Sequence, residues 1–177
     1  MISLFICGDF CPLSRVAEHI SRGDSGRILN DFIPIIANSD YSITNFEYSI
    51  GDKSWGIPKI GPVLCGTEAT VSFLKGSGFD CVTLANNHFF DCGQKGVLES
   101  IKFFKKYHLD YVGGGESQQE ASAIFYKTIK DKKIAFINAC EHEFSIANAT
   151  HGGSNPIDII SICQAIKDAK ENSDHII

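Results

Sequence analysis

The sequence lacks a concentration of positive charge. Its formal net charge is −5 at pH 7, and its lysines are scattered, with Lys102, Lys105 and Lys106 spaced as on the solvated face of a helix. Proteins that bind nucleic acid usually carry a basic stripe that follows the phosphates. We therefore expect no nucleic-acid partner.

Long apolar runs are also missing. No stretch approaches the roughly 20 apolar residues that a membrane-spanning helix requires. The chain opens on the apolar run 2–7, without a cationic leader or a cleavage site of small residues. These features predict a chain without a transmembrane segment, located in the cytoplasm. A mature domain whose leader has been removed would look the same, so the extracytoplasmic face of the membrane is the alternative.

Closely spaced cysteine pairs are absent as well. The seven cysteines are an odd number, contain no Cys-x-x-Cys motif, and mostly fall inside apolar runs. A thiol in such a run behaves as a small hydrophobic group. This usage predicts free thiols and a reducing compartment.

What the chain does contain is an alternation of short β-rich runs with segments of helical period, which predicts an α/β layered domain. Strands are expected at 2–7, 41–47, 81–84, 111–112, 124–129 and 134–137, with another opening at 174–177. The polar turn 130–132 predicts a hairpin between two of them. No linker or repeat interrupts the pattern, so residues 1–177 are expected to form a single domain.

Helices are expected between these strands. The first presents Ile28, Leu29, Phe32, Ile35 and Ile36 on one face, after a cap at Asp24 or Ser25. The second runs from a Thr67 cap to Leu74 and stops at Gly76, and the third contains residues 97–104. In the fourth, Asn155 is the expected cap and Pro156 the first helical residue.

Three polar clusters accompany the ends of the first three expected strands. They are Gly8-Asp9, Asn45-Phe46-Glu47 and Asn86-Asn87-His88. Ligands of α/β sheets bind at the carboxyl ends of the strands, so these clusters can converge on one site. Carboxylate, amide oxygen and imidazole are suitable ligands for a divalent cation, and a two-metal site needs a carboxylate that bridges both ions. The pattern predicts a metal centre at this edge of the sheet.

The same segments carry a family resemblance. Gly8-Asp9, Asn45-x-Glu47, the run 78–88 followed by Asp91-x-Gly93, and the glycines 113–115 occur in an order that resembles the CapA family of capsule biosynthesis. That family is similar to the calcineurin-like metallophosphatases. The resemblance covers essentially the whole chain, and the run 78–88 is its most specific part. It implies a metallophosphatase-like layered sheet sandwich flanked by helices, incomplete at the C-terminus, with residues 1–177 as its N-terminal portion.

The resemblance also implies roles for individual residues. Asp9 and Asn87 match metal ligands, and Glu47 matches the carboxylate that bridges the two ions. His88 matches an imidazole that contacts the reacting oxyanion or protonates the leaving group, and Asp91 would orient it. Taken singly, these residues have plainer interpretations: Asp9 as a turn former, Glu47 as a surface charge, and the 86–88 run as a turn.

Further polar residues are candidates for supporting roles. Asn45 and Asn86 could orient the ligands, and Glu141 with His142 is placed at the rim of the pocket, where a polar loop start is an equally open interpretation. Cys11 stands two positions after Asp9, where the superfamily usually has a histidine that the CapA branch tends to lack. A soft metal ligand is one interpretation of Cys11, and ordinary loop packing is favoured over it. The glycines 113–115 predict a tight turn between a strand and a helix.

Cofactors follow from the resemblance alone. It implies divalent metal ions, Mn, Zn or Fe, with two in the complete protein. The later histidine motifs that would complete the site are expected beyond Ile177. The 177 residues by themselves are therefore expected to show weak or no turnover.

The resemblance implies a metal-dependent hydrolase-like domain, a metallophosphatase-like hydrolase when full length. It would act on or handle an envelope polymer such as poly-γ-glutamate, or a small-molecule substrate. The alternative is a non-catalytic accessory component of capsule synthesis, which binds the polymer or a membrane-bound synthase complex.

Overall fold

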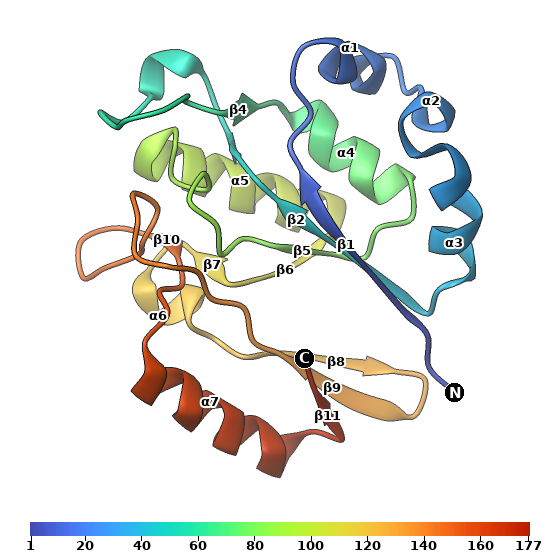
Figure 1. Ribbon diagram of the computed structural model, residues 1–177, viewed down its shortest axis with the longest axis vertical. Coiled ribbons are helices and arrows are strands. Elements are labelled where there is room, and N and C mark those ends of the chain that lie inside the picture. The colour runs from blue at the N-terminus through green and yellow to red at the C-terminus, as the bar shows by residue number, and fades with distance from the viewer.

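The computed structural model describes all 177 residues, which form four stacked layers (Figure 1). The central layer is a parallel sheet of four strands in the order β1-β2-β5-β6. Its strands are β1 (Leu4–Phe10), β2 (Tyr41–Phe46), β5 (Cys81–Thr83) and β6 (Asp110–Val112). The α/β layered class predicted from the sequence, with a parallel sheet flanked by helices, is confirmed.

Helices cover one face of this sheet (Figure 1). They are α1 (Arg15–Ser21), α2 (Ser25–Leu29), α3 (Ile33–Asn38), α4 (Glu68–Gly76) and α5 (Gly93–Tyr107). Their buried side chains join Phe46 and Val82 of the sheet in one apolar core, together with Leu74 and Ile101. Burial of this apolar surface is the main force that holds the layer in place. None of the helices in the structure is both long enough and apolar enough to cross a bilayer.

A second sheet packs against the other face. It consists of β8 (Phe125–Ile129), β9 (Lys132–Phe136) and β11 (His175–Ile176), in the order β11-β9-β8. The predicted hairpin is confirmed, because β8 and β9 pair antiparallel across a turn in which Lys130 has φ +56°. Ile43 and Val112 of the central sheet meet Ile134 and Phe136 in a second core. Helix α7 (Ile159–Asn172) forms the outermost layer (Figure 1).

Two short pairs of strands connect the loops at the carboxyl ends of the central strands. Strands β3 (Ser49–Ile50) and β4 (Cys65–Gly66) pair in parallel, and β7 (Gly114–Gly115) pairs antiparallel with β10 (Gly153–Ser154). The glycines 113–115 do lie between β6 and helix α6 (Gln118–Ala121), but two of them form a strand rather than a turn alone. A Cβ on Gly114 would lie 2.6 Å from the Cβ of Leu84, so this close approach requires glycine.

Two helix predictions are wrong in detail. The first helix is broken into α2, a 3₁₀ turn (Asn30–Phe32) and α3, because Asn30 has φ +42° and Pro34 stands in the first turn of α3. As a result Phe32 is 54% exposed instead of buried. The fourth helix starts at Ile159, capped by Asp158, whose carboxylate accepts from the Ser161 N–H at 2.8 Å.

The residues expected to start that fourth helix are used elsewhere. Asn155 donates its side-chain N–H to the Asn138 carbonyl at 2.9 Å, and Pro156 pairs with Cys140 in an isolated bridge. Strand β1 also differs from its expected bounds. It extends through Asp9 to Phe10, with an irregular register after Ile6, so Asp9 lies within the strand rather than after it. A further 3₁₀ turn (Lys53–Trp55) lies in the β3–β4 loop.

Candidate functional site

The strand register brings the first polar clusters to one edge of the central sheet. Asp9 of β1 is paired with Asn45 of β2, and Asn45 is paired with Thr83 of β5. Because all three strands are parallel, their carboxyl ends lie side by side. The loops that carry Glu47 and the 86–88 run leave from this same edge.

Asn45 is the centre of the hydrogen bonding at this edge. Its Nδ2 donates to Asp9 Oδ1 at 2.8 Å and to Glu47 Oε2 at 3.0 Å. Its Oδ1 accepts from Thr83 Oγ1 and from Asn86 Nδ2, each at 3.1 Å. A single amide therefore holds two carboxylates close together, and its own orientation is fixed by two donors behind it.

The two carboxylates influence one another. The hydrogen bond from Asn45 lowers the pKa of Asp9 below its ordinary value, and interaction with Glu47 lowers it further. Burial raises the pKa of Glu47, and the neighbouring Asp9 raises it again, because two negative charges in one place repel. The buried cation Lys59 is bound to Asp91 and not to this pair. The Asp9–Glu47 pair is thus a place where a positive charge would be stabilised.

Asn86 and Asn87 differ in what they contact. Asn86 is buried, its Nδ2 also donates to the Phe46 carbonyl at 3.0 Å, and its Oδ1 accepts from the His88 N–H at 3.0 Å. It therefore fixes the turn that presents its neighbours. The Asn87 side chain is half-buried and makes no hydrogen bond in the protein, which leaves its amide oxygen available to a ligand.

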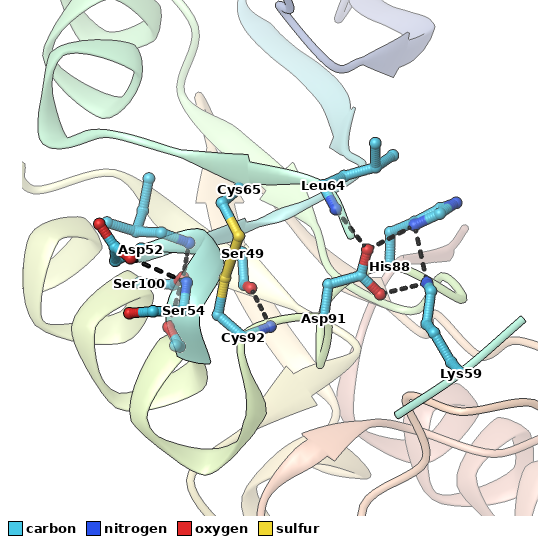
Figure 2. Close-up of a disulfide and its surroundings, with 12 residues drawn as sticks. Ser49, Asp52, Ser54, Lys59, Leu64, Cys65, His88, Asp91, Cys92 and Ser100 are labelled. Carbon is cyan, nitrogen blue, oxygen red and sulfur yellow. Dashed lines mark hydrogen bonds and ion pairs between the residues drawn. A yellow bond between two sulfur atoms is a disulfide. The ribbon is translucent and has the colours of Figure 1, made fainter. Parts of the chain in front are cut away.

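His88 belongs to a network that is nearly closed to solvent. Its Nδ1 lies 2.8 Å from Asp91 Oδ2, and Asp91 is 0% exposed. The other carboxylate oxygen of Asp91 is bonded to Lys59 Nζ, and Lys59 is 2% exposed. Figure 2 shows the three side chains converging. Asp91 contacts the His88 ring, as its predicted orienting role requires, and that role stays a prediction. Lys59 had no signal in the sequence.

The loop that carries Lys59 is held beside this network by a hydrogen bond and a disulfide. The Leu64 N–H donates to Asp91 Oδ2 at 2.7 Å, and the next residue, Cys65, forms a disulfide with Cys92 (Figure 2). The expectation that all cysteines are free thiols is wrong for this pair. The two cysteines are 27 residues apart in the chain and meet only because β3–β4 pairing brings the loop back to the start of α5.

Cys11 lies close to the carboxylates but is packed as an apolar group. It is half-buried against the helical core. Burial raises the pKa of its thiol to about 11, and the charges of Glu47, Asp91 and Asp9 add to the effect. The thiol is therefore protonated at neutral pH and packs against the core as a small apolar group.

The remaining predicted residues lie apart from this network. Glu141 and His142 are both exposed, and His142 Nε2 lies 3.3 Å from the Ile157 carbonyl. Neither has a hydrogen bond to the residues around Asn45. A residue that the sequence did not indicate does support the site: Ser154 of β10 has its Oγ 2.8 Å from the Leu84 carbonyl and 2.9 Å from that of Asn86.

A divalent cation requires several oxygen, nitrogen or sulfur ligands around one point. Nowhere in the chain do three His, Cys, Asp or Glu side chains come together in a metal-binding arrangement. The edge of the sheet instead offers two adjacent carboxylates, Asp9 and Glu47, and the unengaged amide of Asn87 belongs to the turn that Asn86 ties to Asn45. This oxygen-rich set fits part of the coordination shell of a hard or borderline cation.

The parallel sheet flanked by helices is consistent with a metallophosphatase-like layered fold. The chain matches the family described as "Bacterial capsule synthesis protein PGA_cap" over residues 3–177, and it belongs to that family. Membership supports a role in capsule biosynthesis.

Two relatives place the chain more closely. It is 30% identical to the capsule biosynthesis protein CapA of Bacillus anthracis, over 99% of this chain and 45% of that protein. It is 27% identical to the PGA biosynthesis protein CapA of Bacillus subtilis (strain 168), over 100% of this chain and 48% of that protein. The chain thus spans about half the length of these relatives.

Proposed function

We propose that this chain is part of a metal-dependent hydrolase-like protein that acts on or handles an envelope polymer such as poly-γ-glutamate. The observation that carries the proposal is the pair of carboxylates held together by Asn45, beside a histidine whose Nδ1 is occupied by Asp91. Repelling carboxylates and a positioned imidazole are costly to maintain without a functional reason.

The proposed cofactor is a divalent ion of Mn, Zn or Fe, with two in the complete protein. Asp9, Glu47 and Asn87 would hold it. When bound, such an ion would act as a Lewis acid on an electrophilic substrate. Burial and the neighbouring Asp9 raise the pKa of Glu47, and a bound cation would offset the repulsion between the two carboxylates.

The chain's own residues supply orientation and a proton position. Asp91 holds His88 through Nδ1, so Nε2, which makes no hydrogen bond in the protein, is directed away from the network (Figure 2). His88 is 14% exposed, enough to reach a reactant from a mostly dry surface. Nε2 is therefore the proposed site of proton transfer to or from the leaving group.

The proposed substrate rests on the relatives. One of them is named as a PGA biosynthesis protein and the other as a capsule biosynthesis protein. Poly-γ-glutamate is polyanionic, and this chain carries a net charge of −5. A bound cation at Asp9 and Glu47 would supply the attraction that the protein surface itself does not.

An accessory role without catalysis is the second candidate. The absence of a cluster of three ligating side chains favours it, because a partial shell binds metal weakly. In this role the same edge of the sheet would bind the polymer or a membrane-bound synthase complex. The Cys65–Cys92 disulfide supports the extracytoplasmic location proposed above as the alternative, because disulfides persist in oxidising compartments.

Metal content separates the two functions. The protein is purified without a metal-binding tag, and its Mn, Zn and Fe content is measured by mass spectrometry, alongside Asp9→Asn and Glu47→Gln. Glu18→Gln, at an exposed position, is the matched control. Hydrolysis of poly-γ-glutamate and of a phosphoester is then measured with the full-length protein.

The hydrolase is supported if the wild-type protein contains metal and the two site variants do not. Turnover should also fall by orders of magnitude in Glu47→Gln and in His88→Ala. A metal-free protein whose polymer binding is unchanged in these variants supports the accessory role and refutes the hydrolase.

A further inference from the structure

The arginines of this chain are gathered in one short segment. Arg15, Arg22 and Arg27 are its only arginines, and they lie in α1, in α2 and in the turn between these helices. All three are exposed. The ion pairs of the protein use lysine or histidine throughout, so no arginine is paired with a carboxylate. Their guanidinium groups are therefore available to an anion from outside the protein.

Two of the arginines line a common hollow between α1 and α2. The hollow has a volume of about 720 Å³, and its polar side chains are those of Arg15, His19, Arg27 and Asn30. No carboxylate is among the lining residues. Asp24 lies outside the hollow, with its Oδ2 3.1 Å from His19 Nδ1. The hollow thus offers two guanidinium groups and one amide that can donate hydrogen bonds to an oxyanion.

The fold sets the spacing of the two helices that form this hollow. Helix α1 ends at a glycine in the left-handed conformation, Gly23 with φ +72°, whose N–H donates to the Ile20 carbonyl at 2.9 Å. Ile20 of α1 and Leu29 of α2 are both buried in the helical core. The backbones that carry Arg15 and Arg27 are therefore held on opposite sides of the same hollow.

Two guanidinium groups at a set spacing favour a ligand with several carboxylates. The planar fork of an arginine can donate two parallel hydrogen bonds to one carboxylate. A single pair of this kind is weak when it is exposed to water, so an isolated carboxylate would be held poorly. A chain with a carboxylate in every repeat unit can contact both arginines, and its second contact is intramolecular.

The hollow lies close in the chain to the edge of the sheet that carries the paired carboxylates. Helix α1 follows β1, the strand that contains Asp9, after the short connection 11–14 (Figure 1). The protein as a whole has a net charge of −5, so its average field repels a polyanion. Attraction must come from local contacts, and the α1–α2 hollow supplies cationic groups without a competing carboxylate.

We propose that Arg15 and Arg27 form a binding subsite for a polycarboxylate chain, which the α1–α2 hollow receives. The identification of this chain as poly-γ-glutamate rests on the proposed function. The affinity for a chain of carboxylates does not, because it requires neither a metal ion nor hydrolysis. The subsite would hold the polymer beside Asp9 and Glu47 in a hydrolase and in an accessory protein alike.

The test is the binding of fluorescently labelled poly-γ-glutamate to the metal-free 177-residue protein, followed by fluorescence anisotropy at pH 7 and about 50 mM salt. The wild type should bind, and the dissociation constant should rise about tenfold in Arg15→Gln/Arg27→Gln. Added salt should weaken binding by the wild type more than by the double variant. Because both side chains are exposed and unpaired, the variant should keep the wild-type free energy of unfolding.

The matched control is Arg22→Gln/Lys53→Gln, which removes two positive charges from exposed positions outside the hollow. Its affinity should stay within about twofold of wild type. The proposal is overturned if the wild type does not bind the polymer, or if Arg15→Gln/Arg27→Gln binds it as tightly as wild type. An equal loss of affinity in the control variant would also overturn it, since net charge alone would then explain the binding.

A second variant locates the polymer relative to the paired carboxylates. Without metal, Asp9→Asn/Glu47→Gln should bind poly-γ-glutamate at least as tightly as wild type, because two negative charges near the subsite are removed. A weaker affinity in this variant would mean that the carboxylate edge itself binds the polymer, and would overturn the proposal.

Measurements on the full-length protein separate the subsite from the proposed function. If polymer binding depends on Arg15 and Arg27 in a protein that has no metal and no turnover, the hydrolase is refuted and the subsite stands. If the full-length protein hydrolyses the polymer with the same KM in Arg15→Gln/Arg27→Gln as in wild type, the subsite is refuted and the hydrolase stands.

Discussion

Asn45 and Asn86 are joined directly through their side chains, with Asn86 Nδ2 3.1 Å from Asn45 Oδ1. The bond links the end of β2 to the turn after β5, across 41 residues of sequence. Asn45 also donates to both carboxylates, so the two asparagines connect the turn after β5 to Asp9 and Glu47. Changes at Asn45 should therefore affect the whole edge.

Asn45→Ala should destabilise the metal-free protein by about 1.5–3 kcal/mol, because hydrogen bonds to two charged groups are lost and the Asp9–Glu47 repulsion is no longer offset. The free energy of unfolding in urea at pH 7 measures this change. Asn172→Ala, which removes one exposed hydrogen bond of a side chain in α7, is the control and should stay within about 0.5 kcal/mol of wild type. An equally small effect at Asn45 would contradict the central role given to it.

Glu47→Gln should make the metal-free protein more stable at neutral pH. Because burial and Asp9 raise the pKa of Glu47 above its ordinary 4.5, the folded state holds this proton more tightly than the unfolded state. The associated stability is present below pH 4.5 and is lost as the pH rises through the folded pKa. Glutamine is neutral throughout, so the variant should exceed wild type at pH 7 and approach it near pH 4.

The measurement for Glu47 is the unfolding free energy from pH 4 to pH 8, with Glu18→Gln as an exposed control. Addition of Mn²⁺ should reverse the order at pH 7, since a ligand that binds only the folded state stabilises the protein that retains the site. A wild-type protein that is already more stable than Glu47→Gln without metal would contradict the account of the carboxylate pair.

The Cys65–Cys92 disulfide should stabilise the fold by about 2–4 kcal/mol, because it closes the loop between β4 and α5 in the unfolded chain. The double variant Cys65→Ser/Cys92→Ser should lose this amount in urea unfolding, and reductant should bring wild type close to it. Cys163→Ser, at an exposed free cysteine, serves as the control. Detection of seven alkylatable thiols in the unreduced, unfolded protein would refute the disulfide.

Alkylation should distinguish Cys11 from Cys163. With a thiol pKa of about 11, only roughly one Cys11 in a thousand is the reactive thiolate at pH 8. Cys163 is exposed and should be modified first by iodoacetamide, as peptide mass spectrometry will show. The rate at Cys11 should increase steeply towards pH 11. Equal rates at pH 8 would mean that Cys11 is more accessible, or more acidic, than its packing indicates.

Much of the fold could be predicted from local patterns. The buried strands have apolar, β-branched sequences, and the 130–132 turn is polar, so β2, β5, β8 and β9 were expected within a few residues of their observed bounds. The break in the first helix was not expected. Apolar residues keep their helical spacing across Asn30 and Pro34, although the helical backbone conformation is interrupted there. Local backbone geometry overrode periodicity there.

The site could be predicted only where it follows strand ends. Asp9, Asn45 and Glu47 come together because parallel strands align their carboxyl termini. Lys59 and Cys65 belong to a long irregular loop without periodicity, and their contacts with Asp91 and Cys92 depend on the tertiary path of that loop. No spacing rule connects residues that meet in this way.

The register of β2 makes the chemistry of this protein inseparable from its packing. Along the strand Tyr41 and Ile43 point into the interface between the two sheets, and Asn45, two residues further on, is next in that alternation. A slip of one position would turn the amide towards the helices and bury it among hydrocarbon. Loss-of-function variants of this protein should thus include interior positions such as Ile43, which no reactant ever touches.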